Sequence, residues 1–317
     1  MAIYDCFTFY NEYELLELRL SLLYDVVDYF VISELDVTQS GSPKRYNFYE
    51  NKNKFLPYMD KIIYLKETNA PLLYGNKKLV NKSDMTMTGD WAIENYQRNC
   101  LIHGLKDCNF DDLIIISDLD EIPNPDVLRN LDEQQVFFNY SDFNNWKTFI
   151  KGIEYLLLFS KSKKRLLDIF FNRCKVKDVL KYMPISLELD IYYYFLNCKS
   201  YGKGHYPILS YYKNLMMPQI MRNIARISPY IKNAGWHLSY MGGMKRIKQK
   251  LSAIIEGNPN ISKDEEHIKA CLAQGKDLYG RKGKEFEYTF IDLENINIPS
   301  VKQFIEKYPE FYYFKNR

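Results

Sequence analysis

The chain has 317 residues, of which 46% are hydrophobic and 26% charged, enough apolar side chains for one large folded domain. Its formal net charge of +3 gives no general reason to expect nucleic-acid binding. The six cysteines are scattered without a C-x-x-C pair, which argues against a zinc site and a disulfide framework and favours a reducing, cytoplasmic compartment.

Apolar runs alternate with helical patterns through the first third of the chain. The runs predict four strands, at Ile3–Phe9, Val26–Ser33, Lys61–Leu65 and 113–116. A leucine-rich helix should follow the first strand, with Asn11 and Glu14 forming a capping box, and a second helix should cover Trp91–Leu105. This order predicts an α/β protein with a Rossmann-like, mostly parallel sheet, as one domain over residues 1–317.

The fourth predicted strand ends in an acidic motif, Asp118-Leu-Asp120-Glu121-Ile-Pro123. Open α/β sheets bind ligands at the carboxyl ends of their strands, so these acids are expected to face a cleft. Asp118 and Asp120 should point the same way and hold Mn²⁺ or Mg²⁺, which prefer oxygen ligands. A D-x-D motif of this kind is used by glycosyltransferases that take a nucleotide-sugar donor. The alternative interpretation is a solvated loop or a helix cap before Pro125.

Residues 141–186 interrupt the alternation of strands and helices. Between Lys147 and Lys181 there are ten Lys or Arg against three acids, and apolar residues recur at helical spacing. We expect a basic amphipathic helical insertion, which could be a solvated face, a surface for anionic lipid or a lid over an acceptor. The apolar run 155–159 is too short to span a bilayer, and no signal peptide is evident. A sheet-like stretch follows at Leu187–Phe195, then helices at Met244–Ile255 and Glu265–Gln274.

In these features the chain resembles glycosyltransferase family 17. The resemblance is carried, in order, by Asn11-Glu12, Leu15-Leu16 and Arg19, 27–31, Thr38, Gly41, Pro43, Trp91, Arg98, 118–123 and Gly235-Trp236-His237-x-Ser239. It covers roughly residues 3–130 and 187–280. It implies a GT-A fold, UDP-N-acetylglucosamine as donor, a glycan hydroxyl as acceptor and inversion at the anomeric carbon. It also implies that His237 is a further metal ligand, although a lone histidine is more often structural.

Four further residues are candidates for binding the donor, together with Asp118. Glu12 and Glu34 follow the first two strands, where carboxylates can accept hydrogen bonds from ribose or uracil, and Asn11 lies beside Glu12. Glu12 could equally stabilise the first turn of a helix. Arg98 is expected to clamp the diphosphate, or else to form an ordinary ion pair with Glu94 four residues earlier.

Inversion in one displacement needs a general base that takes the proton of the acceptor hydroxyl. Glu121, beside the expected metal, is the first candidate, and Glu188 and Asp190 are alternatives. Two other functions use similar features. A haloacid-type phosphatase also has D-x-D after a strand, but normally on the first strand and followed by Thr. A non-catalytic glycan-binding module would keep the cleft without turnover.

Overall fold

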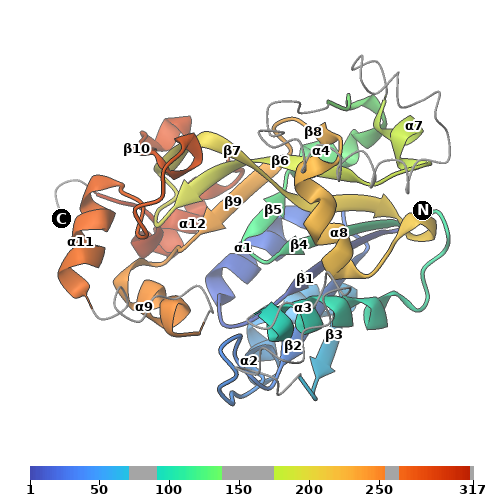
Figure 1. Ribbon diagram of the computed structural model, residues 1–317, viewed down its shortest axis with the longest axis horizontal. Helices are drawn as coiled ribbons and strands as arrows, with labels where there is room; N and C mark the ends of the chain where they lie inside the picture. Colours follow the sequence, from blue (N-terminus) through green and yellow to red (C-terminus); the bar gives the residue numbers. More distant parts are fainter. Residues whose placement is uncertain (71–90, 138–174, 254–263, 315–317) are drawn as a thin grey trace.

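The computed structural model describes residues 1–70, 91–137, 175–253 and 264–314 (Figure 1). The strands of these residues form one sheet, in the order β3-β2-β1-β4-β7-β6-β9-β5, with β10 paired to β7 and β8 to β6. Their bounds are β1 Ile3–Thr8, β2 Tyr29–Leu35, β3 Ile62–Glu67, β4 Leu113–Asp118, β5 Glu121–Pro123, β6 Ile185–Tyr193, β7 Cys198–Tyr211, β8 Tyr230–Ile231, β9 Gly235–Ser239 and β10 Tyr288–Phe290. The α/β class expected from the sequence is confirmed.

Helical segments connect and cover these strands. The α-helices are α1 Tyr13–Leu23, α2 Asn47–Asn51, α3 Ala92–Asn99, α4 Pro125–Arg129, α7 Val176–Leu180, α8 Pro218–Ile224, α9 Gly243–Ala253, α11 Glu265–Gln274 and α12 Val301–Lys307. Short 3₁₀ helices are η1 Lys52–Lys61, η4 Cys100–Leu105, η5 Leu131–Glu133, η6 Tyr212–Asn214, η7 Ala225–Ile227, η8 Lys284–Phe286, η9 Leu293–Asn295 and η10 Pro309–Phe311. No helix among the described residues is long and apolar enough to cross a membrane.

The first half of the sheet is parallel. β3, β2, β1 and β4 pair in parallel, so their carboxyl ends meet at one edge. Beyond β4 the sheet is mixed, because β7 pairs antiparallel with both β4 and β6. The prediction that β4 lies within a parallel sheet is therefore right on one side and wrong on the other.

The interior strands are buried on both faces, because alternate side chains enter two separate apolar cores. In β4, Leu113 and Ile115 pack in the core covered by α1, whereas Ile114 and Ile116 pack in the core covered by η4 and α8. This arrangement explains why the sequence of β4 is a continuous apolar run rather than an alternating one. A third core joins α9, α11 and β10 at one end of the molecule (Figure 1).

A glycine lets β5 pair closely with β9. β5 follows β4 after two residues, yet it pairs antiparallel with β9 at the far end of the sheet order. In β9, Gly235 has a φ of +154°, and a Cβ there would lie 2.2 Å from the carbonyl oxygen of Ile122. Only glycine permits this approach, which places His237 opposite Glu121 in the register.

The predicted cap of the first helix is wrong, and most of the predicted insertion at 141–186 stays a prediction. Glu12, not Asn11, is the N-cap residue of α1, and it makes no capping hydrogen bond with its side chain. The predicted capping box is wrong, because the carboxylate of Glu14 pairs with Arg246 of α9 instead. Of the predicted insertion 141–186, residues 141–174 lie outside the described residues, so its helical character stays a prediction.

Candidate functional site

A cleft of about 370 Å³ opens at the carboxyl ends of the parallel strands. Its walls include Thr8 and Phe9 at the end of β1, Val37–Gln39 after β2, and Asp118–Glu121 at the end of β4. The rest of the wall comes from the C-terminal half of the chain, from β6, β7, β9 and β10 and from segments near them. The acidic motif therefore faces a cleft, as its position after an apolar strand predicted.

The acidic motif forms a tight turn whose backbone is held by one buried arginine. Arg19 of α1 is fully buried and forms an ion pair with Asp5 of β1 at 2.5 Å. Its Nη1 donates to the carbonyl oxygens of Asp118 (2.9 Å), Leu119 (3.1 Å) and Glu121 (2.9 Å). Arg19 thereby fixes the backbone of the turn from the side of α1, and the carboxylates of the turn face the cleft.

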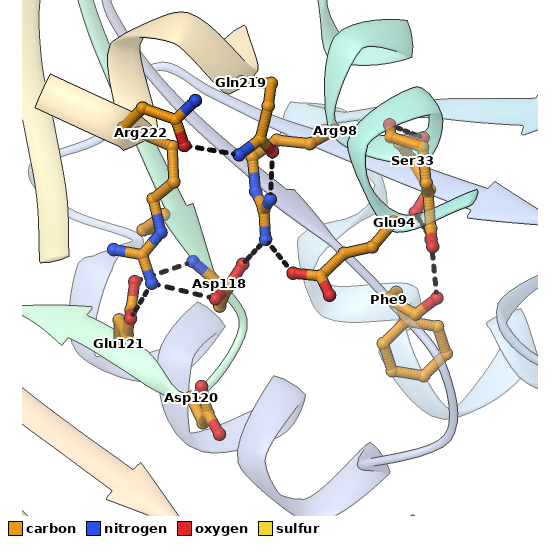
Figure 2. A network of polar contacts seen from close by, with 12 residues as sticks. Phe9, Ser33, Glu94, Arg98, Asp118, Asp120, Glu121, Gln219 and Arg222 are labelled. Atoms are coloured by element: carbon orange, nitrogen blue, oxygen red, sulfur yellow. Dashed lines mark hydrogen bonds and ion pairs between the residues drawn. The ribbon is translucent and has the colours of Figure 1, made fainter. Parts of the chain in front are cut away.

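Asp118 lies between two guanidinium groups. Its Oδ1 accepts from Arg98 Nη2 at 2.7 Å, and its Oδ2 accepts from Arg222 Nη2 at 3.0 Å (Figure 2). Burial alone would raise the pKa of Asp118, but the two adjacent cations hold it well below its ordinary value. Asp118 is therefore ionised at any physiological pH.

Asp120 is paired with residues of the C-terminal half. Its Oδ2 accepts from Lys250 Nζ at 2.9 Å, and its Oδ1 lies 3.7 Å from His237 Nε2. Although burial opposes it, the Lys250 ammonium lowers the pKa of Asp120. Burial lowers the pKa of His237, and its Nδ1 is buried without a hydrogen-bond partner among the described residues. A metal-binding imidazole usually donates a hydrogen bond from the ring nitrogen that does not bind the metal. The described residues offer His237 Nδ1 no acceptor for such a bond.

Glu121 is the most perturbed acid of the motif. Its side chain is 1% exposed, accepts from Arg222 Nη2 at 2.5 Å and accepts from the backbone N–H of Asp118 at 2.9 Å. Burial, together with the charges of Asp118 and Asp120, raises its pKa to about 8, although Arg222 acts in the opposite direction. A carboxyl group with such a pKa can exchange a proton near neutral pH.

Glu34 and Asn11, which were predicted to bind the donor, do not line the cleft. Glu34 is fully buried and is not part of the cleft wall, because its carboxylate accepts from Lys44, from the N–H groups of Asn47 and Phe48, and from Tyr64. It caps α2 and orients Lys44, which does line the cleft. Asn11 lies outside the cleft wall, whereas Glu12 is part of it.

Arg98 contacts the motif rather than the cleft. Its guanidinium is 3% exposed and bridges Glu94 and Asp118, with Gln219 as a further acceptor (Figure 2). The alternative part of the prediction, the i,i+4 pair with Glu94, is present, and the same guanidinium also contacts Asp118 of the D-x-D motif. Because Arg98 does not line the cleft, the structure gives it the role of positioning Asp118.

Sequence reasoning missed the basic residues that complete the site. Arg222 of α8 and Lys250 of α9 both line the cleft and pair with the acidic motif, more than 100 residues away along the chain. Neither lies in a recognisable local motif. The only signal was indirect, since three acids beside a buried strand require cations from elsewhere.

Part of the cleft wall is aromatic. It contains six ring side chains, which are Tyr193, Tyr206, Tyr240, Tyr279, Phe286 and Tyr288. Tyr193 stacks on Tyr288 with ring centroids 4.8 Å apart, and Tyr240 shares a 2.6 Å hydrogen bond with Tyr279. Such a wall can pack against the apolar face of a sugar ring while its hydroxyl groups reach polar atoms.

An α/β sheet that presents paired carboxylates and basic side chains to one cleft is typical of proteins that bind phosphorylated ligands, often with a divalent cation. The comparisons with known proteins refine this class. Residues 1–165, more than half of the chain, match the model of glycosyltransferase family 17. The chain therefore belongs to glycosyltransferase family 17, the family that its sequence motifs resemble. No curated protein matches the chain significantly.

The matched range divides the site in two. It contains Arg19, Arg98 and the acidic turn, whereas Arg222, His237 and Lys250 lie beyond it. The family match thus covers the carboxylate half of the site, and the basic half lies outside the matched range.

Proposed function

We propose that the protein is an inverting glycosyltransferase of GT-A type that transfers N-acetylglucosamine from UDP-N-acetylglucosamine to a hydroxyl of a glycan acceptor. Family membership supports the transferase class. The observation that carries the proposal is the turn from Asp118 to Glu121, whose carboxylates face the cleft at the end of β4. That position is where α/β sheets bind nucleotides.

The donor atoms at the turn fit Mn²⁺ or Mg²⁺ in chemical type. Asp118 and Asp120 offer carboxylate oxygens, and His237 Nε2 faces Asp120. In the described part of the chain these atoms do not form a group within 4.8 Å of one another, and Lys250 is paired with Asp120. We infer that Lys250 releases Asp120 when the cation is held. A bound cation would neutralise the diphosphate and the charge of departing UDP.

Basic side chains of the cleft supply positive charge independently of a cation. Arg222 and Lys250 lie at the acidic turn, and Lys44, Arg226 and Arg281 lie elsewhere on the wall. Because Arg222 shares its charge with two acids, it also keeps their carboxylates oriented. We propose that Lys250 and Arg222 contact the donor diphosphate, and that the aromatic wall holds a sugar ring.

Glu121 is the proposed general base, which takes the proton of the acceptor hydroxyl as that oxygen attacks the anomeric carbon. Of the three candidates, only Glu121 lies in the cleft wall. Asp190 is occupied by Lys199 and Lys203, and Glu188 accepts from the N–H of Asn233 outside the cleft. Geometry therefore favours Glu121 over both alternatives.

The acceptor and the cellular setting are further proposals. The basic segment 141–186 would bring a cytoplasmic enzyme to an anionic membrane, where a glycan acceptor is displayed. Most of this segment lies outside the described residues, so the proposal depends on its sequence alone: ten basic residues against three acids between Lys147 and Lys181.

One experiment separates the transferase from the two alternative functions. The full chain is incubated with UDP-N-acetylglucosamine and Mn²⁺, with and without a mixture of glycans, and UDP release is measured. A transferase releases UDP faster with an acceptor and stops in excess chelator. A phosphatase would hydrolyse phosphate monoesters without a sugar nucleotide, and a binding module would release nothing. Either of the last two results would refute the proposal.

A further inference from the structure

A second group of metal-binding side chains lies outside the cleft. It consists of Glu67, the last residue of β3, and of Cys100 and His103 on the 3₁₀ helix η4. A carboxylate oxygen, the thiol sulfur and a ring nitrogen lie within 4.8 Å of one another, and His103 Nδ1 is 2.8 Å from Glu67 Oε1. None of the three residues is part of the cleft wall.

The geometry of η4 brings these donors together. In a 3₁₀ helix, side chains three residues apart lie one above the other, so Cys100 and His103 point in the same direction. η4 also packs against β3, the strand that delivers Glu67. Nearby, the hydroxyl of Tyr96 donates to the carbonyl of Thr68 at 2.9 Å, which ties the preceding helix to the same strand end.

The donor set has a specific chemical preference. A thiolate, an imidazole and a carboxylate are the three ligand types that Zn²⁺ takes in proteins, commonly with water in a fourth position. A glutamate and a thiolate together carry the two negative charges that balance a divalent cation. Cys100 is buried and the Glu67 side chain is 16% exposed, whereas His103 is 50% exposed, so one side of the group remains open to water.

We propose that Glu67, Cys100 and His103 bind one zinc ion. The sequence argument against a zinc site considered only cysteine pairs, and it did not consider a C-x-x-H spacing combined with an acid 33 residues before the cysteine. The simplest alternative is an ion pair between Glu67 and His103 beside an inert thiol.

The site would stabilise the helix that supports the cleft. η4 continues α3 without a break, and α3 carries Glu94 and Arg98, which orient Asp118. A zinc ion joining η4 to β3 would therefore fix the position of Arg98 relative to the sheet. Because none of the three ligands lines the cleft, this effect does not depend on the proposed transferase activity.

Cobalt substitution tests the site, because a thiolate bound to Co²⁺ gives an ultraviolet sulfur-to-cobalt charge-transfer band. The full chain is freed of metal with a chelator and titrated with Co²⁺, and the band should saturate at one equivalent. Zn²⁺ should then displace the cobalt and abolish the band. A cation at the acidic turn cannot produce this signal, because Asp118 and Asp120 offer only oxygen. The band should therefore persist in the D118N/D120N double variant.

Matched variants locate the thiolate. Cys100→Ser should abolish the band, and His103→Gln should weaken cobalt binding without unfolding the chain, since its side chain is half exposed. The control is Cys271→Ser, because Cys271 also lies near a histidine, with its sulfur 3.6 Å from His267 Nε2. No band in the wild type, or a band lost in Cys271→Ser but kept in Cys100→Ser, would overturn the proposal.

Discussion

Replacing Arg19 by Met should destabilise the protein strongly. The Arg19 side chain is fully buried, pairs with an equally buried Asp5 and donates to three carbonyl oxygens of the acidic turn. Removing one partner of a buried ion pair costs about 3–5 kcal/mol, because the other charge stays buried without compensation. With an unfolding entropy of about 2.1 cal/mol/K per residue, a 317-residue chain should lose about 5–8 °C in melting temperature.

Urea unfolding followed by circular dichroism measures this loss. The matched control is Arg129→Met, whose ion pair with Asp126 is 48% and 70% exposed and should contribute less than about 1 kcal/mol. The double variant D5L/R19M should recover part of the loss, since it leaves no unpaired charge. A loss below about 1 kcal/mol in Arg19→Met, or a double variant less stable than Arg19→Met, would refute this reasoning.

Four further outcomes are expected. Asp118→Asn and Asp120→Asn should each lower UDP release at least about 100-fold, equivalent to about 2.7 kcal/mol, while circular dichroism still shows a folded chain; full turnover in either variant would refute the role of the motif. Arg222→Gln should reduce kcat/KM by about 10–100-fold through lost charge at the diphosphate, whereas the exposed Arg129→Gln should leave it unchanged, and equal rates in the two would exclude Arg222 from the site. Calorimetry should show tighter binding of UDP than of GDP or CDP, and equal affinities would remove the proposed donor. Co-sedimentation with anionic liposomes should occur at low salt and weaken as salt rises, and a protein that stays in the supernatant at low salt would refute the membrane proposal.

The parts of the fold that could be predicted are those with strong local signals. β1 to β4 follow runs of apolar residues, and α11 was predicted with its observed bounds, Glu265–Gln274. That helix has a capping side chain, Asp264, at its start and a left-handed glycine, Gly275, at its end. Local chemistry alone defines such boundaries.

The longest strand escaped prediction for a physical reason. β7, Cys198–Tyr211, contains Gly202, Gly204 and Pro207, which disfavour strands, and its burial alternates irregularly. It is a strand because it pairs with β4, β6 and β10, and these tertiary contacts override its local preference.

The candidate site also contains residues that could be predicted from the sequence and residues that could not. The acids could be predicted, because an apolar strand followed by carboxylates is a continuous pattern. Arg222 and Lys250 could not, since their meaning depends on partners 101 and 130 residues away. For Glu34 the sequence predicted a contact with the ligand that the structure does not show. Its place near the end of β2 suggested this contact, but its carboxylate instead accepts hydrogen bonds from backbone N–H groups of α2.

The pairing of β5 with β9 has a consequence for how the protein emerges from the ribosome. The acidic turn is synthesised early, yet the strand that anchors it, Gly235–Ser239, follows more than 100 residues later. Contacts between such distant segments slow folding, because a long loop must close before they form. The nascent chain can assemble β1 to β4 first, while the carboxylates of the turn remain hydrated. Only when synthesis has passed Lys250 can the turn acquire its full set of partners, so the site cannot mature before β9 and α9 have been made.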